Sequence, residues 1–323
     1  MKDVLVIANP LMDQMVFVDE DQIKKIGVKP GSMSLVELEE ADRLVASLAG
    51  WALSPGGSET NTAVGVAALG GTVKLLGAIA DDELGQRYRD DLRQYPGLDI
   101  NFEVYPMNEY RMKTGASYIL VLPDGERTMM TYLGASSLLS GGCISQEDIN
   151  KTSIVYFDAY LLDLPAGEAI LDALFTSLQI SPAKVIFGLA DVNVVERQYE
   201  KINDLIGKID VLLANDSEIS TLMRMDDIEA ATVKLANSKL QVAVTLGSKG
   251  ALVRENNETK IIEAIRVEDV VDTTGAGDQF AAGICFGISN KMSLEDSARI
   301  GVTAAAEVIG HLGARPLAAI PEL

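Results

Sequence analysis

Residues 272–278 read Asp-Thr-Thr-Gly-Ala-Gly-Asp, and residues 279–283 continue as Gln-Phe-Ala-Ala-Gly. Gly275, Ala276 and Gly277 carry little or no side chain, so the backbone N–H groups of this turn can approach a ligand closely. The apolar stretch that follows predicts a helix. A helix N-terminus favours anions, because its first N–H groups are unpaired and its dipole is positive there. The sequence therefore predicts a phosphate-binding turn at the start of this helix.

Asp278 falls in the first turn of that helix, beside the expected anion. A carboxylate cannot bind a phosphate, but it can accept the proton of a hydroxyl that attacks one. We therefore predict that Asp278 is a general base, while the amides of Gly275, Ala276 and Gly277 stabilise the transferred group. One alternative is an ordinary capped helix. Another is a protein that binds its ligand without phosphorylating it, which would have no chemical need for a carboxylate here.

Other nucleotide-binding and catalytic motifs are missing from the chain. Neither the G-x-x-x-x-G-K-[ST] phosphate loop nor the G-x-S-x-G nucleophile turn occurs. Phe280 stands where a dinucleotide fingerprint would place its third glycine, which argues against an NAD-dependent oxidoreductase. His311 is the only histidine, so a zinc site built on several histidines is excluded.

The composition limits the partners of the protein. Its 323 residues include 27 Lys and Arg against 47 Asp and Glu, a formal net charge of -20. That charge repels a phosphate backbone and no basic cluster offsets it, so nucleic acid is not an expected partner. A phosphorylated ligand must be held locally, by backbone dipoles, a few cations or a metal.

Compartment and membrane association are also suggested by the sequence. Cys143 and Cys285, the only two cysteines, are expected to be reduced and largely buried. The N-terminus passes directly into a strand-like run and does not resemble a signal peptide. The apolar tract at 63–80 is interrupted by glycines and a lysine, so we expect no membrane span. These features predict a cytoplasmic protein.

Short runs rich in Val, Ile and Leu alternate with longer amphipathic stretches. Such runs suit strands that are covered on both faces, and the alternation indicates a parallel sheet between two helical layers. We therefore predict an α/β fold, a three-layer α/β/α sandwich with a mainly parallel central sheet. The expected strands are 4–8, 73–79, 154–157, 185–188, 211–214 and 242–245, and the expected helices are 167–178, 196–206, 218–240, 281–288 and 293–309.

Two places break this alternation. Residues 15–18 follow the first strand before any helix, and Pro123-Asp124-Gly125 is a turn signal that predicts a hairpin. We expect a small β-rich subdomain, formed from about residues 14–45 and 100–135, that stands off the main sheet as a lid and is inserted into a single domain over 1–323. Because exposed lid strands can pair between subunits, a homodimer through the lid stays open.

Two further segments carry polar groups toward the expected ligand. Pro55-Gly56-Gly57-Ser58-Glu59-Thr60-Asn61 precedes a helix-like stretch, and its glycine amides and Asn61 carboxamide can bond hydroxyls. Taken alone, this segment fits a turn and helix cap equally well. Asn9-Pro10-Leu11-Met12-Asp13 closes the first strand, at the sheet edge where open α/β folds bind ligands. The carboxylate of Asp13 can accept two hydroxyls of a vicinal diol, although it also suits a strand-ending turn.

These segments resemble the signatures of the PfkB, or ribokinase-like, family of carbohydrate and nucleoside kinases. Gly56-Gly57-x3-Asn61 is similar to the N-terminal signature, and residues 272–283 are similar to the C-terminal one. The resemblance extends across essentially the whole chain. It implies a ribokinase-like fold and a kinase that uses ATP and Mg²⁺ to phosphorylate an alcohol, in line, under a closed lid.

The resemblance also implies cofactor-binding residues in the C-terminal half. Asn215-Asp216-Ser217-Glu218 is similar to the family's N-x-x-E motif, associated with Mg²⁺ and phosphate. We expect Glu218 to act through water, because Mg²⁺ keeps several waters. The implied nucleotide-binding residues are Asn215, Thr245, Gly247, Gly250 and Thr274. A monovalent cation such as K⁺ beside Asp272 and Thr274, as in some members, stays open.

Within the family, residues 9–13, Gly56-Gly57-Ser58 and Gly125-Glu126-Arg127 resemble those of adenosine kinases. By that resemblance Asp278 activates the 5′-hydroxyl of a nucleoside. The implied substrate-binding residues are Asn9, Asp13, Gly56, Gly57, Asn61, Arg127 and Tyr160. Arg127 either swings toward the phosphates or remains a solvated hairpin arginine. Tyr160 is the one aromatic side chain where a stacking pair is implied, so a kinase of ribose or another furanose-type sugar stays the alternative.

Overall fold

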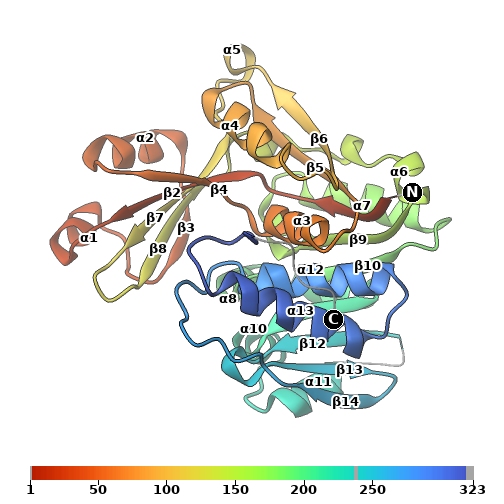
Figure 1. Ribbon diagram of the computed structural model, residues 1–323. Helices are drawn as coiled ribbons and strands as arrows, with labels where there is room; N and C mark the ends of the chain where they lie inside the picture. The colour runs from red at the N-terminus through yellow and green to blue at the C-terminus, as the bar shows by residue number, and fades with distance from the viewer. Residues whose placement is uncertain (1, 236–238, 318–323) are drawn as a thin grey trace.

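The computed structural model describes residues 2–235 and 239–317 (Figure 1). Its centre is a nine-stranded sheet in which β12 through β6 run parallel, while β13 and β14 form an antiparallel edge. The prediction of a mainly parallel sheet is confirmed. Across the sheet the strands are β14 (Glu258–Ile262), β13 (Ala251–Glu255), β12 (Gln241–Thr245), β11 (Val211–Asn215), β10 (Lys184–Gly188), β9 (Thr152–Asp158), β1 (Lys2–Ile7), β5 (Val73–Ala80) and β6 (Leu98–Tyr105).

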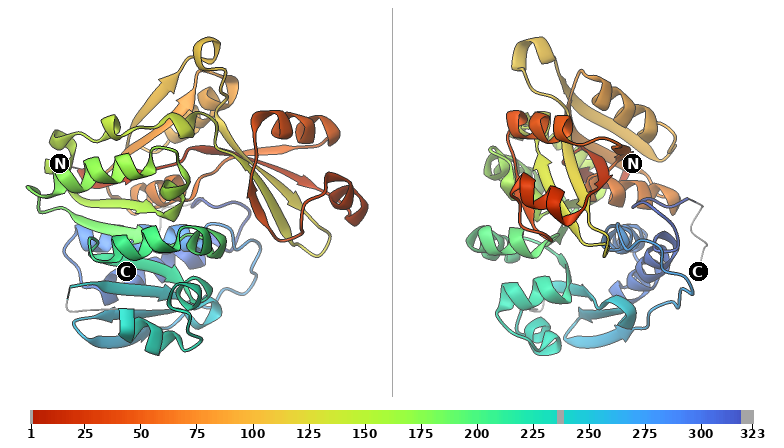
Figure 2. Two further views of the ribbon diagram at one scale, coloured as in Figure 1. Left: turned by 180° about the vertical axis from the view of Figure 1, so that it is seen from behind. Right: turned by 90° about the vertical axis from the view of Figure 1, so that its left-hand side faces the viewer.

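Helices cover both faces of this sheet (Figures 1 and 2). Successive residues of β1 show why: Leu5 and Ile7 pack into one apolar core, and Val4 and Val6 into the other. The first core lies under α6 (Gln146–Asn150), α7 (Gly167–Leu178), α8 (Val192–Arg197), α9 (Tyr199–Ile206), α10 (Asp216–Met223) and α11 (Ile228–Leu235). The second lies under α3 (Ser58–Ala68), α4 (Glu83–Leu92), α12 (Ala276–Ser289) and α13 (Leu294–Val308). The expected three layers are present.

Two of the predicted helices are each divided in the structure. The stretch at 196–206 forms α8 and α9, and α8 begins earlier than predicted because Asp191 caps it with bonds to the N–H groups of Asn193 and Val194. The stretch at 218–240 ends first at Arg224, which has a left-handed φ of 54°, and resumes as α11. Residues 236–238 of that prediction lie outside the described residues. No helix within 2–235 or 239–317 is long and apolar enough to cross a membrane.

A smaller, five-stranded sheet projects from the side of the large sheet (Figure 2). Its strands in order are β3 (Met33–Leu35), β8 (Arg127–Tyr132), β7 (Gly115–Val121), β2 (Leu11–Phe17) and β4 (Ala52–Pro55). Strands β7 and β8 pair antiparallel, which confirms the predicted hairpin. One face packs beneath α1 (Glu20–Ile26) and α2 (Leu38–Ser47) around its own apolar core. The predicted homodimer would have to pair at β3 or β4, the edge strands, and stays a prediction.

The segments expected to form the lid differ from this sheet in three places. β2 begins at Leu11, three residues before the expected boundary at 14. β4 pairs with β2 and was not foreseen, because it is short and exposed and therefore lacks alternating polarity. β6 pairs with β5 in the large sheet although part of it was expected in the lid. Its half-exposed position at the sheet edge admits polar residues that obscure the strand pattern.

The remaining elements are short or end close to their predicted limits. Helix α12 contains the expected 281–288 and begins earlier, and helix α13 ends one residue short of the expected 293–309 at each end. Cys143 and Cys285 are both free, and Cys285 is fully buried, as predicted. The short helical segments are α5 (Met107–Tyr110), η1 (Gly134–Leu138), η2 (Gly141–Cys143), η3 (Ala159–Asp163) and η4 (Gly247–Lys249).

Helices α12 and α13 pack with their backbones in contact at Gly283. A Cβ added there would lie 2.3 Å from the backbone nitrogen of Gly301, so Gly283→Ala must push the helices apart. We expect the free energy of unfolding to fall by about 1–3 kcal/mol in urea titrations. Gly207→Ala is the control, because its φ is -77° and nothing lies within 4 Å of its Cβ position. Equal stability of Gly283→Ala and wild type would contradict this account of the helix contact.

Candidate active site

Three cavities lie side by side along the carboxyl edge of the large sheet. We call them the lid cavity, beneath the small sheet; the middle cavity, at the ends of β9 to β12; and the C-terminal cavity, between η4 and α13. Their volumes are about 220, 300 and 520 Å³ respectively. Ser58 and Asp278 line both the lid and middle cavities, and Gly277 lines both the middle and C-terminal cavities. Asp278 thus lies at the junction between two of them.

The glycine-rich turn starts α12, as the sequence predicts. Gly275 precedes the helix with a left-handed φ of 82°, which glycine adopts without strain. A Cβ on Gly275 would lie 2.5 Å from the carbonyl oxygen of Ala314, so the C-terminal segment also requires glycine there. The N–H groups of Gly277 and Asp278 fall in the first helical turn and have no partner within the helix. The N–H of Ala276 donates to the Thr273 carbonyl at 3.3 Å, so this expected anion donor already has a partner inside the turn.

Asp278 is held by two side chains of α3. The Oγ of Ser58 donates to its Oδ1 at 2.8 Å, and the Nδ2 of Asn61 donates to its Oδ2 at 3.0 Å. Burial raises the pKa of Asp278, whereas these two hydrogen bonds and the charge of Arg315 lower it. A carboxylate offers about four lone-pair sites, so Asp278 can still accept a ligand hydroxyl.

The glycine pair before α3 serves the site differently from the prediction. The N–H of Gly56 donates to the Leu11 carbonyl at 2.9 Å, and its carbonyl accepts from Tyr88 at 2.6 Å. The prediction that this amide bonds a substrate hydroxyl is therefore wrong, because pairing between β2 and β4 occupies it. Gly57 lines the lid cavity as expected, with a left-handed φ of 87° at the start of α3.

Asp13 projects from β2 into the lid cavity. A Cβ on Gly56 would lie 2.3 Å from its carboxylate, so this glycine is what leaves room for Asp13. Burial and the charge of Asp278 raise the pKa of Asp13, Arg315 and Arg127 lower it, and the net result is a pKa of about 7. The structure therefore places Asp13 in the same cavity as the candidate base.

Asn9 and Tyr160 line the same cavity from the large sheet. The Asn9 Nδ2 donates to Glu59 Oε1 at 3.3 Å, whereas its Oδ1 is buried without a hydrogen-bond partner. Tyr160 lies in η3, where its N–H donates to Asp158 at 2.9 Å. An unpartnered buried carbonyl oxygen at a cavity wall is an acceptor available to a ligand.

Arg127 connects the small sheet to the anion turn. Its Nη2 lies 2.8 Å from Asp272 Oδ1, and its Nη1 contacts Thr274. The side chain of Arg127 is 30% exposed, and that of its partner Asp272 is 5% exposed. Arg127 is therefore neither a free hairpin arginine nor directed at the middle cavity. Asp272 also accepts from the N–H and hydroxyl of Thr274. The carboxylate of Asp272 is therefore already paired with the guanidinium of Arg127. A monovalent cation beside Asp272 and Thr274 stays a prediction.

Asn215 and Glu218 begin α10 at the middle cavity. They form a capping box: Asn215 Oδ1 accepts from the Glu218 N–H, and the two Glu218 carboxylate oxygens accept from the backbone N–H and Nδ2 of Asn215 at 2.9 and 2.7 Å. Burial raises the pKa of Glu218 to about 7. Asn215 therefore holds both carboxylate oxygens of Glu218 in place, and the expected role of Glu218 through water stays a prediction.

The middle cavity has the donor set of a hydrated divalent cation. Asp158, Glu218 and Asp278 all line it, and the buried carboxyl group of Asp158 interacts with that of Glu59. No group of three or more His, Cys, Asp or Glu residues forms a ready-made metal cage in the described part of the chain. Mg²⁺ commonly keeps several waters and binds through one or two carboxylates and a phosphate, so these residues fit it.

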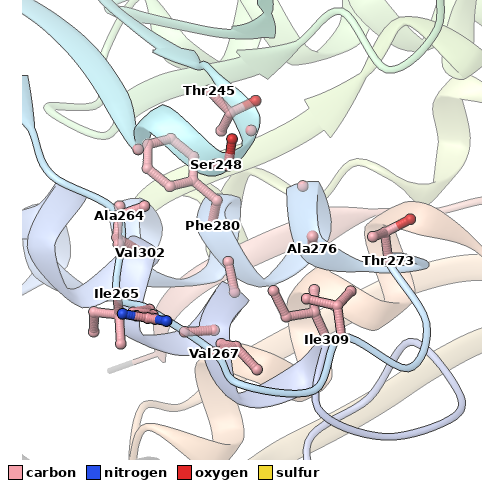
Figure 3. Close-up of a pocket in the computed structure, with 17 residues that line it drawn as sticks. Thr245, Ser248, Ala264, Ile265, Val267, Thr273, Ala276, Phe280, Val302 and Ile309 are labelled. Atoms are coloured by element: carbon pink, nitrogen blue, oxygen red, sulfur yellow. The ribbon is translucent and has the colours of Figure 1, made fainter.

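The C-terminal cavity is largely apolar (Figure 3). Thr245, Gly247 and Gly250 line it from the turn between β12 and β13, as predicted for nucleotide-binding residues. Asn215 and Thr274, predicted with them, line the middle and lid cavities instead. The apolar walls are formed by Ala264, Ile265, Val267, Val270, Phe280, Val302, Ala305, Ala306 and Ile309. An apolar slot that reaches a helix N-terminus suits a flat base joined to phosphates.

The family is decided by comparison with known proteins. The profile described as "pfkB family carbohydrate kinase" matches residues 17–321 of this chain. The chain belongs to the PfkB family. This PfkB protein is thus a phosphotransferase of the class that acts on hydroxyl groups, and ATP is the phosphate donor that such a kinase implies.

Similar structures confirm the ribokinase-like fold of this PfkB kinase. An adenosine kinase from Sinorhizobium meliloti is 33% identical, with 99% of this chain and 97% of that chain covered and a TM-score of 0.91. A probable sugar kinase protein from Rhizobium etli CFN 42 is also 33% identical, with 99% and 96% covered and a TM-score of 0.90. The curated ribokinase of Haemophilus influenzae is 27% identical over 80% of this chain and 82% of its own length. These relatives therefore differ in their named substrates.

The variant Gly277→Ala tests the role of the anion turn in nucleotide binding without a change in the stability of the fold. Nothing lies within 4 Å of the Cβ position of Gly277, so we expect an unchanged Tm. The added methyl occupies the space between the middle and C-terminal cavities, and we expect ATP affinity to fall about tenfold, or about 1.4 kcal/mol, in calorimetric titrations. Gly207→Ala is again the matched control. Full ATP affinity in Gly277→Ala would remove this turn from the nucleotide site.

Proposed function

We propose that this PfkB kinase transfers the γ-phosphate of ATP to the 5′-hydroxyl of a ribonucleoside, adenosine or a close analogue. The observation that carries the proposal is the divided lining of the lid cavity. The large domain contributes a mostly polar end, lined by Asn9, Ser58, Glu59, Asn61, Tyr160, Asp163, Thr274 and Asp278. The small sheet contributes a mostly apolar end, lined by Leu11, Met33, Leu35, Ile119, Met129 and Leu133 together with Asp13, Arg127 and Thr131. A nucleoside has a hydroxyl-bearing sugar and a flat, weakly polar base, which match these two ends. A free sugar carries hydroxyls all around its ring.

Asp13 and Asn9 supply the acceptors for the ribose in this proposal. Each lone carboxylate or amide oxygen can accept a hydroxyl, and Asp13 can accept two. Met129 and Thr131 of β8, with Leu133 directly after that strand, cover the base. Similarity to an adenosine kinase over nearly the whole chain supports this substrate class.

Asp278 is the general base in this mechanism. It accepts the proton of the attacking hydroxyl while its two oxygens stay fixed by Ser58 and Asn61. The N–H groups of the α12 first turn stabilise the charge on the transferred phosphoryl group. Mg²⁺, when bound in the middle cavity, neutralises phosphate charge. Glu218 and Asp158 orient its waters there.

The small sheet excludes water from the lid cavity in the same proposal. The ion pair between Arg127 and Asp272 holds that sheet against the anion turn. Water that reached the γ-phosphate would compete with the acceptor hydroxyl, so a closed sheet favours transfer over hydrolysis.

A panel of acceptors tests the substrate class. ADP release is measured with adenosine, inosine, ribose and fructose at equal concentrations. Burying about 100 Å² of base against the apolar end contributes about 2.5 kcal/mol, so kcat/KM for adenosine should exceed that for ribose by about 50-fold or more. Equal or faster turnover of ribose or fructose would instead make the protein a sugar kinase. The rate without acceptor gives the background hydrolysis.

Asp278→Asn tests the base. The amide keeps the size of the side chain but cannot accept the hydroxyl proton, so we expect kcat to fall about 10²- to 10⁴-fold. Thermal melting and ATP titration establish that the variant still folds and binds nucleotide. Asp172→Asn, an exposed change on α7, is the matched control. Retention of more than a tenth of the wild-type kcat would assign the base to another group.

A further inference from the structure

We propose that Arg315 is a positioning residue for phosphoryl transfer, which acts by holding the Asn61 carboxamide so that its Nδ2 faces Asp278. The proposal rests on the proposed role of Asp278 as the base. Arg315 lies in the C-terminal segment after α13, far in sequence from every motif that marks the site.

The segment that carries Arg315 is fixed against the anion turn. The N–H of Gly313 donates to Asp272 Oδ2 at 3.3 Å, and the Ala314 carbonyl accepts from Gln279 Nε2 at 3.0 Å. Gly275 packs against Ala314 so closely that it has no room for a Cβ. Residues 313–315 therefore cover the turn that the proposed mechanism uses.

The guanidinium of Arg315 is itself restrained on several sides. Its Nε donates to Asn61 Oδ1 at 3.1 Å, and its Nη1 pairs with Asp91 of α4. Its side chain is only 10% exposed, and its Cζ lies 5.8 Å from the centre of the Tyr88 ring. A planar guanidinium restrained in this way defines the direction of its Nε–H bond.

This contact decides which end of Asn61 meets the base. Arginine has only donors, so it selects the carboxamide oxygen of Asn61. The NH₂ group must then point the other way, where it donates to Asp278 Oδ2 at 3.0 Å. With the amide reversed, NH₂ would face the guanidinium and the oxygen would face a carboxylate, and both contacts repel. The two hydrogen bonds can therefore run in one direction only: Arg315 donates to Asn61, and Asn61 donates to Asp278.

Arg315 also carries a buried positive charge near two carboxyl groups. It lowers the pKa of Asp13 and of Asp278, against the burial that raises both. The other charged and titratable groups around these two carboxyls are Glu59 and Tyr88 from the α3 and α4 side, Asp91, Arg127 from β8, and Tyr156, Asp158 and Tyr160 from β9 and η3.

The first experiment compares kcat and KM of wild type, Arg315→Gln and Arg315→Lys with the acceptor that the panel finds fastest. We expect Arg315→Gln to lower kcat about tenfold, because the Asn61 carboxamide is no longer held, with KM for ATP within about threefold. Arg315→Lys keeps a donor that can reach Asn61 Oδ1, so it recovers part of that loss. Arg299→Gln, an exposed change on α13, leaves both constants unchanged. An unchanged kcat in Arg315→Gln overturns the proposal.

The second experiment is a double-mutant cycle with Asn61→Leu. If Arg315 acts through Asn61, Arg315→Gln lowers kcat about tenfold in wild type but less than about threefold once Asn61 is replaced. Equal losses in both backgrounds would mean a merely structural role and would overturn the proposal. If melting shows that Arg315→Gln does not fold, Arg315→Lys enters the cycle in its place. The cycle works equally with a sugar acceptor, so a failed nucleoside assignment does not affect it.

Discussion

The site depends on placing one carboxylate beside the binding place of a polyanion and keeping it both ionised and oriented. Asp278 shares its helical turn with the N–H groups of the proposed phosphate site, so it cannot be moved away from the negative charge expected there. Burial favours its neutral form, and the donors Ser58 and Asn61 favour the charged form. The glycines of the turn, the helix α3 and the C-terminal segment are arranged around this single requirement.

The same requirement explains how a chain of net charge -20 can hold a nucleotide. The middle cavity has acidic walls, since Asp158, Glu218 and Asp278 line it, and it would repel phosphate unless a cation entered with it. The neighbouring C-terminal cavity offers mainly apolar contact and the start of α12, with Arg266 as a basic side chain in its lining. Overall charge is therefore a poor guide to the ligand, whereas local backbone donors are a good one.

Local patterns in the sequence were sufficient for the family and for most of the large sheet. The strands of continuous Val, Ile and Leu were found because both faces are buried, and the turn at 272–278 because its residues all serve one short piece of backbone. What could not be predicted depends on partners distant in sequence. The Gly56 amide is taken by Leu11 through the pairing of β2 and β4, and Arg315 reaches Asn61 across 254 positions. No local signal marks either contact.

The two sheets line different parts of the site, and this explains why the acceptor is harder to identify than the reaction. The groups that handle phosphate come from the large sheet and α12, whereas much of the lid cavity is lined by one face of the small sheet. That face consists of alternate residues of β2, β3, β7 and β8, and their other face forms a separate core beneath α1 and α2. Side chains such as Met33 and Met129 can therefore change without disturbing the phosphate machinery. Asp13 lies on the same face of the small sheet, but its carboxylate needs the space that Gly56 leaves for it. The proposed hydroxyl-binding part of the lid cavity therefore depends on the large domain, whereas the proposed base-covering part does not.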